Sequence, residues 1–276
     1  MRWLRAAVGV VCSVVVLQAS PAFAAPAPDS TSRTVWQTLG DDLSISVSDA
    51  GRVFTSPARF DRDQWVDASA VLIGTGALMA FDSTGRRWVY ENKGQELDNL
   101  AKVGNLYGEV TVGAGIATVV YAGGLIAGKE KIRVTGRMLF ESLLFSGAVT
   151  TVLKALIGRA RPYTDEGAFA FHGPQLGADH LSLPSGHSTV AFAVSSVLAT
   201  RFHNPMATIL LYGLASITAG ARIYSDKHWL SDTFLGAAIG TSIGYGVAHL
   251  HDEDGTGQQT WMITPSFNGI TLTARL

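Results

Sequence analysis

The sequence predicts an all-α protein, a six-helix bundle core with short β segments near both ends of the mature chain. Two observations predict the bundle. Charged residues make up only 16% of the 276 residues, against about 25% in ordinary soluble domains. Six uncharged stretches rich in Ala, Leu, Val and Gly are also long enough for helices. They cover residues 68–81, 110–128, 142–153, 188–200, 204–221 and 233–250.

The first 24 residues are expected to be a secretory signal peptide. Arg2 and Arg5 precede an apolar run over residues 6–17, and an Ala-x-Ala site follows at 22–24. An uncleaved anchor helix is the alternative. The single cysteine, Cys12, lies in this segment, so the mature chain would have neither disulfides nor cysteine catalysis.

Residues 25–65 are predicted to form a polar N-terminal extension. Within it the segment DLSISVSD alternates polar and apolar residues and is followed by Gly51, a pattern typical of a short strand and turn. The net charge of −1 gives no basic footprint for nucleic acid.

Residues 66–251 are predicted to be the helical domain. The third helix is expected to start near Val134 and to continue to Arg161, where Pro162 disfavours more helix. Pro184 and Ser185 are typical of the start of the fourth helix.

Residues 252–276 are predicted to be a tail with a β-hairpin. The pattern alternates around Asn268-Gly269, a dipeptide that favours tight hairpin turns. The hairpin is expected to pair with the strand over residues 43–47.

Three charged islands interrupt the apolar scaffold. In KALIGRARP, Lys154 and Arg161 are seven residues apart, which would place both on one helix face. In PSGH, Ser185 and Gly186 at a helix start would present free N–H groups to an anion. The segment ARIYSDKHWLSD is the third island.

In this third island Arg222 precedes His228 by six residues, and Asp232 follows His228 by four. At that spacing on a helix, Asp232 can accept a hydrogen bond from the imidazole. The bond would fix the tautomer and make the other ring nitrogen a better nucleophile or base.

Each island alone has a plainer interpretation. The cations could complement a helix end or flank a membrane, PSGH could be an ordinary N-cap, and His228 with Asp232 could be a structural pair. A metal site of His187, His228 and Asp232 is a further alternative, disfavoured because the nearby cations would repel a divalent ion.

Together the islands resemble the three-part signature of the type 2 phosphatidic acid phosphatase and vanadium haloperoxidase superfamily. The signature K-x6-R-P, P-S-G-H and S-R-x5-H-x3-D stands here as KALIGRARP, PSGH and ARIYSDKHWLSD. Ala221 stands where the pattern has Ser, which removes one hydroxyl near the phosphate. The resemblance implies the family's six-helix core.

The resemblance also implies a role for each matching residue. His228 would attack phosphorus, Asp232 would orient it, and His187 would protonate the leaving oxygen and then activate water. The phosphate would be bound by five residues: Lys154, Arg161, Ser185, Gly186 and Arg222. No metal and no other cofactor would be needed, because the cations supply the neutralising charge.

Other residues are expected to have plainer roles. His172 and His180 are interpreted as solvated histidines of the loop over residues 163–183. Arg159 is expected to face away from Lys154 and to serve helix packing or lipid headgroups.

The predicted function is a metal-independent phosphatase that hydrolyses a phosphomonoester or pyrophosphate through a phosphohistidine. The apolar scaffold makes a phosphorylated lipid the favoured substrate and a membrane surface the favoured partner. The alternatives are a soluble periplasmic acid phosphatase or phosphotransferase acting on small phosphomonoesters, and a vanadate-dependent haloperoxidase.

The expected location is the periplasmic side of a bacterial envelope. A cleaved signal peptide leaves residue 25 in the periplasm, and the uncharged stretches 142–153 and 188–200 fall short of the roughly 20 residues of a span. We therefore predict a secreted helical domain resting on a membrane. An integral inner-membrane protein with a periplasmic active site is the alternative.

Overall fold

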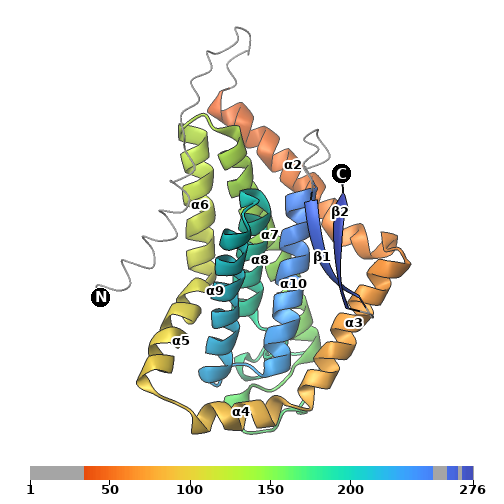
Figure 1. The fold of residues 1–276 in the computed structure, drawn as a ribbon, viewed down its shortest axis with the longest axis vertical. Coiled ribbons are helices and arrows are strands. Elements are labelled where there is room, and N and C mark those ends of the chain that lie inside the picture. Colours follow the sequence, from red (N-terminus) through yellow and green to blue (C-terminus); the bar gives the residue numbers. More distant parts are fainter. Residues whose placement is uncertain (1–33, 251–259, 267–268, 276) are drawn as a thin grey trace.

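A computed structural model describes residues 34–250, 260–266 and 269–275. The predicted signal peptide, residues 1–24, lies outside this part of the chain. Within the described part, nine α-helices precede two strands (Figure 1). The helices are α2 (Val35–Thr55), α3 (Arg62–Met79), α4 (Asp82–Glu91), α5 (Gln95–Tyr107), α6 (Val110–Ile126), α7 (Glu130–Ile157), α8 (Gly186–Phe202), α9 (Pro205–Tyr224) and α10 (Leu230–His249), and the strands are β1 (Thr260–Ser266) and β2 (Gly269–Arg275).

The six predicted helices correspond to α3 and α6 to α10, but the predicted fold class is wrong in two respects. The described residues form nine helices rather than six, because α2, α4 and α5 were not expected. The predicted strand over residues 43–47 lies inside α2. The β segment near the N-terminus is therefore absent from the described residues, and β1 pairs antiparallel with β2 instead.

Helix α2 has a capped N-terminus and buries carboxylates on its polar face. Thr34 caps its first turn in a reciprocal pair with Gln37. Asp42 and Asp49, two turns apart, are buried, whereas Leu43 and Val47 are exposed. The helix therefore buries two carboxylates and exposes two large apolar side chains, while Ala50 and Val53 still pack against the core.

Close packing of α10 against α8 aligns their N-terminal ends. A Cβ at Gly240 would lie 2.3 Å from the Thr189 carbonyl oxygen, and one at Gly244 would lie 2.6 Å from that of Ala193. Only glycine permits this approach. The Ser185 N–H donates to the Asp232 carbonyl at 2.9 Å, which joins the starts of the two helices.

The helix directions gather the three charged islands at one end of the bundle. Helices α7 and α9 end where α8 and α10 begin, next to α4 (Figure 1). The start of α7 and the helix α2 lie toward the opposite end. The core between the ends includes Met138, Leu139, Val194 and Val247, all fully buried.

Candidate active site

Helix α7 ends before Arg161, so Lys154 and Arg161 do not share a helix face as predicted. Gly158 has a left-handed backbone with φ of 60°, which terminates the helix. Arg161 follows in extended conformation. The two side chains still meet: Lys154 Nζ donates to the Leu181 carbonyl at 2.6 Å, and Arg161 Nη2 donates to the same oxygen at 3.4 Å.

Arg222, the third cation, approaches from the last turn of α9. Its Nη1 donates to Asn105 Oδ1 at 2.7 Å, while its Nε is buried without a hydrogen-bond partner. Among the described residues, no carboxylate forms an ion pair with Lys154, Arg161 or Arg222. Their positive charge is thus left for another ligand.

Ser185 is the N-cap of α8, as the plainer interpretation of PSGH held. Its Oγ accepts from the Ser188 N–H at 3.4 Å, and the whole residue is buried. A Cβ at Gly186 would lie 3.9 Å from Lys154 Cε. The ammonium side chain therefore passes over the positive end of the α8 dipole, and the two reinforce each other as an anion site.

His228 and Asp232 meet at the start of α10 rather than along a helix face. His228 lies just before the N-cap Trp229, and its Nδ1 is 3.6 Å from Asp232 Oδ2. That separation is too long for a hydrogen bond. Burial, together with the Lys154 charge, lowers the pKa of His228 to about 3 despite the opposing effect of Asp232, so the imidazole is neutral at physiological pH.

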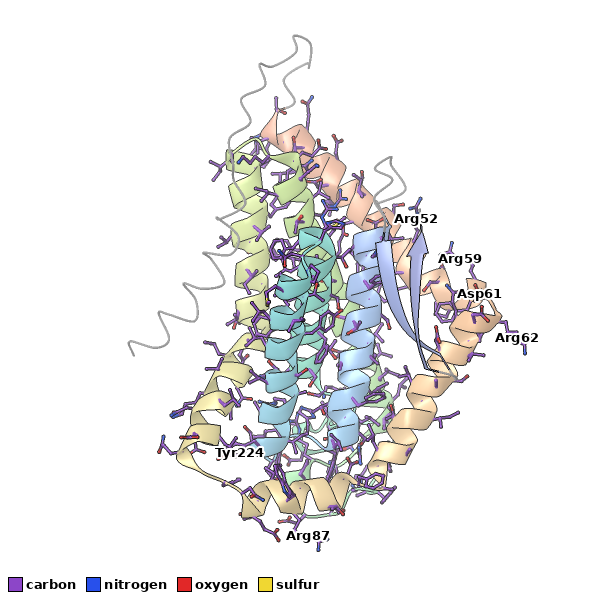
Figure 2. The ribbon with its side chains drawn as sticks, in the orientation of Figure 1. Arg52, Arg59, Asp61, Arg62, Arg87 and Tyr224 are labelled. Atoms are coloured by element: carbon purple, nitrogen blue, oxygen red, sulfur yellow. The ribbon has the colours of Figure 1, made fainter. Side chains whose placement is uncertain are left out.

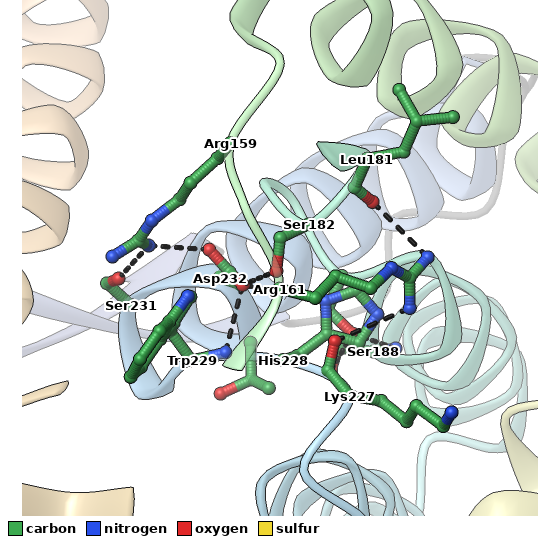
Figure 3. Close-up of polar contacts among 12 residues, drawn as sticks. Arg159, Arg161, Leu181, Ser182, Ser188, Lys227, His228, Trp229, Ser231 and Asp232 are labelled. Carbon is green, nitrogen blue, oxygen red and sulfur yellow. Dashed lines mark hydrogen bonds and ion pairs between the residues drawn. The ribbon is translucent and has the colours of Figure 1, made fainter. Parts of the chain in front are cut away.

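Arg159 holds Asp232 in place and was not predicted to do so. It is fully buried and donates five hydrogen bonds. Figure 3 shows those to Ser231 and Asp232. Its guanidinium contacts Asp232 Oδ1 at 2.6 Å and Asp82 Oδ2 at 2.7 Å. Because the side chain is fully buried, the expected contact with lipid headgroups is wrong. Arg159 instead links α4 to α10 through the two carboxylates.

The second oxygen of Asp232 is occupied as well. It accepts from Ser182 Oγ at 2.5 Å and from the Trp229 N–H at 2.9 Å. The carboxylate beside His228 is therefore fixed from several sides. The carbonyl of Ser182, like that of Leu181, also accepts a hydrogen bond from Lys154 Nζ.

His187 lies one residue into α8 and faces the end of α5. Its Nε2 is 3.2 Å from Glu109 Oε1. Burial and then the Arg222 charge lower the pKa of His187, and Glu109 partly opposes them. In the described part of the chain, His187, His228 and Asp232 do not form a three-ligand group of the kind that holds a metal.

Four contributors escaped the sequence analysis: Asp82, Asn105, Glu109 and Arg159. Asp82, Asn105 and Glu109 come from helices or helix starts outside the three motifs. Arg159 lies inside the first motif, but its position in the spacing does not show what it touches. A signal was available for two of them: Asp82 directly follows one uncharged stretch, and Glu109 directly precedes the next.

The middle and end of the chain resemble known proteins. Residues 136–255 match the model of the PAP2 superfamily. A lipid A 1-phosphatase of Rhizobium etli is 36% identical over 107 residues, 38% of this chain and 45% of that protein. A lipid A 1-phosphatase of Porphyromonas gingivalis is 31% identical over 137 residues, 47% of this chain and 28% of that protein. The chain thus spans less than half the length of these curated relatives.

A solved structure shares the fold. The crystal structure of a transmembrane PAP2-type phosphatidylglycerolphosphate phosphatase from Bacillus subtilis superposes with a TM-score of 0.55 at 19% identity, covering 69% of this chain and 98% of that one. This supports the helical architecture around the motifs. The family match over residues 136–255, together with the three motifs in order, confirms the predicted resemblance to the PAP2 superfamily.

Proposed function

We propose that the protein is a phosphatase that hydrolyses a phosphomonoester or pyrophosphate of a lipid through a phosphohistidine, without a catalytic metal. The observation that carries the proposal is the set of Lys154, Arg161 and Arg222, which lack carboxylate partners among the described residues and lie around a buried, neutral His228. Such a set suits an anionic group that develops further charge during reaction.

Binding would replace internal contacts with phosphate oxygens. Lys154 and Arg161 now donate to backbone carbonyls, which are neutral acceptors. A phosphate oxygen accepts a shorter and stronger, charge-assisted bond. The unpartnered Nε of Arg222 would gain an acceptor, and the N–H of Gly186 would complete the binding site.

Transfer would then occur in two steps. His228 Nε2 donates its electron pair to phosphorus, the bond from phosphorus to the ester oxygen breaks, and His187 gives that oxygen a proton. In the second step His187 takes a proton from water, the water oxygen attacks phosphorus, and the P–N bond breaks. Inorganic phosphate and free His228 result. Asp232, held by Arg159, would orient the imidazole when its Oδ2, now 3.6 Å from His228 Nδ1, moves to hydrogen-bond distance.

The comparisons and the apolar surface support a lipid substrate. The curated relatives are named for lipid A, which makes a lipid A 1-phosphate the first candidate for this chain. Helices α7 and α9 are long and apolar enough to cross a membrane, and two bent helix pairs raise the number of such spans to at most four in the described residues.

These helices favour the integral-membrane alternative over the secreted domain. The 28 residues of α7 span about 42 Å at 1.5 Å per residue, more than the roughly 30 Å of a bilayer core. The prediction that this helix is too short to span a membrane was based only on its uncharged residues, 142–153. Leu144, Val152 and Leu156 of α7 are exposed, where lipid would cover them.

The corner between α2 and α3 also fits a membrane interface. Arg52, Arg59 and Arg62 lie around it (Figure 2), close in sequence to the paired rings of Phe60 and Trp65. Arginine and aromatic residues are enriched where proteins meet lipid headgroups. A periplasmic active site remains part of the proposal.

Phosphate release from a substrate panel tests the proposed function. The panel holds lipid A, phosphatidate, phosphatidylglycerol phosphate, a polyprenyl pyrophosphate and nitrophenyl phosphate, each with and without EDTA. We expect a lipid phosphate to be preferred, EDTA to be tolerated, and vanadate to inhibit as a mimic of the transition state. Activity that EDTA abolishes and a divalent ion restores would contradict the metal-independent mechanism.

A further inference from the structure

We propose that the loop following α7 binds a divalent transition-metal ion of the zinc class through Glu166, His172 and His180. The sequence predicts that both histidines are solvated, and the proposed reaction uses none of the three residues. In the described part of the chain they form the one group of three metal-ligating side chains whose ligand atoms all lie within 4.8 Å of one another.

The side chains already converge on one point. His172 Nε2 lies 2.7 Å from Glu166 Oε2, and His180 Nε2 lies 3.0 Å from Glu166 Oε1. The two imidazole rings have centroids 4.1 Å apart. Zinc ligands at 2.0–2.2 Å in a tetrahedron stand about 3.3–3.6 Å from one another. Small side-chain rotations would therefore admit an ion in place of the two hydrogen bonds.

The backbone holds the two histidines near that geometry. The His172 N–H donates to the Gly158 carbonyl at 2.9 Å, and the His180 N–H donates to that of Gly177 at 3.0 Å. Phe171, next to His172, forms a β-bridge with Arg159. Fixing ligands before the ion arrives reduces the entropy that binding must overcome.

The donor types select the class of ion. Two imidazole nitrogens and one carboxylate suit zinc and its neighbours, whereas magnesium and calcium prefer oxygen ligands alone. The side chains of Glu166, His172 and His180 are 35%, 40% and 25% exposed. Water can therefore reach the group and supply a fourth ligand.

A metal here would stabilise the segment that faces the phosphate-binding cations. His180 is followed at once by Leu181 and Ser182, whose carbonyls receive Lys154 Nζ at 2.6 and 3.2 Å. Two residues before it, the Ala178 carbonyl receives Arg161 Nε at 2.9 Å. The ion would be a structural staple for this loop and would take no part in the transfer steps.

Metal titration of the tag-free, full-length protein in detergent tests the site without substrate, so its result is independent of the proposed function. After chelation and dialysis, we expect one Zn²⁺ or Co²⁺ per chain. The double variant His172→Ala/His180→Ala should lose at least about a hundredfold in affinity, and Glu166→Gln about tenfold or more. His203→Asn, at an exposed histidine after α8, is the matched control and should bind like the parent.

Hydrogen–deuterium exchange gives the second readout. Zinc should slow exchange of the amides over residues 166–182 in the parent and not in the double variant. Thermal midpoints without metal show whether each variant folds. Equal zinc uptake by the parent and the folded double variant would overturn the site, and zinc binding without slower exchange in this segment would overturn the staple.

Discussion

The two ends of the helical bundle both contain buried or half-buried cations, but the groups that contact these cations differ between the ends. At the end near α2, Arg133 and Arg137 contact Asp42, and Arg137 also contacts Glu141. At the other end, the described partners of Lys154 and Arg161 are backbone carbonyls. A cation beside a carboxylate already faces an opposite charge, whereas one beside neutral carbonyls does not.

The partners of the charged residues distinguish the two ends of the bundle independently of the sequence motifs. The cavity of about 410 Å³ at the α2 end is lined by residues of both signs, among them Asp41, Asp42, Arg133 and Arg201. Asp42 in this lining is paired with Arg133 and Arg137. At the other end the buried carboxylates Asp82 and Asp232 are both engaged by Arg159. We therefore propose that the cation-rich end binds the anion and that the α2 end attaches α2 to α7.

Removal of an ion pair at the α2 end should lower the free energy of unfolding and leave turnover nearly unchanged. Arg137→Ala leaves Asp42 and Glu141 with fewer partners in a buried environment, so we expect a loss of about 3–5 kcal/mol in the free energy of unfolding. Denaturation in detergent measures this, and kcat/KM per folded molecule should stay within a few-fold of the parent. Arg62→Ala, at the α2–α3 corner, is the control. A large kcat/KM loss at parental stability would contradict the comparison.

Removal of a cation at the other end should lower turnover and leave the free energy of unfolding nearly unchanged. Arg222→Ala removes a charge that forms no ion pair with a described carboxylate, and we expect kcat/KM to fall by about 10²–10³ with little loss of stability. Steady-state kinetics beside a thermal midpoint separates the two effects. Arg133→Ala is the matched cation from the other end. Equal kinetic effects of the two variants would remove the distinction between the ends.

A variant of Arg159 tests whether this residue acts by positioning Asp232. Lysine has three donors in place of five and cannot bridge Asp82 and Asp232 in the same way. Arg159→Lys should therefore lower kcat about ten- to a hundredfold, as loss of outer support does at other sites, while KM changes less.

The pH profile distinguishes positioning by Arg159 from a general loss of structure. If Arg159 fixes Asp232 beside His228, the variant should shift the acid limb of kcat. An unchanged profile with a lower fraction of active enzyme would mean that Arg159 is only structural.

The smallest expected effect is a pH dependence of stability at His228. Burial lowers its pKa to about 3, below the roughly 6.5 of an unfolded histidine. Between these values the unfolded chain binds a proton that the folded chain does not. Stability should therefore fall on acidification, by at most about 1.4 kcal/mol per pH unit. The thermal midpoint should drop less from pH 7 to pH 5 in His228→Gln than in His203→Asn; identical drops would contradict the burial argument.

The sequence predicted the cation-rich end better than the rest of the molecule. Lys154, Arg161, Arg222, His228 and Asp232 belong to motifs with fixed spacing, and the helix directions bring those motifs together. What failed was local geometry. Gly158 ends α7 before Arg161, and His228 precedes α10, because neither a left-handed glycine nor a cap position can be distinguished from a continuous helix by spacing alone.

Contacts between distant segments explain the remaining errors. Arg159 contacts Asp82, 77 positions away, and no periodicity links the two. Helix α2 alternates like a strand in DLSISVSD, yet its buried Asp42 bonds to Arg137 of α7. The alternation therefore does not mark a strand here, because Asp42 and Asp49 are buried on one face of a helix while Leu43 and Val47 are exposed.

The phosphoenzyme tests the central claim most directly. The His187→Ala variant should still form the phosphoenzyme with nitrophenyl phosphate, whose leaving group needs no proton, and should release it slowly. Mass spectrometry of an alkaline digest should locate an acid-labile phosphate on His228, and none should form in His228→Ala. A phosphate on another residue, or near-normal turnover by His228→Ala, would contradict the account.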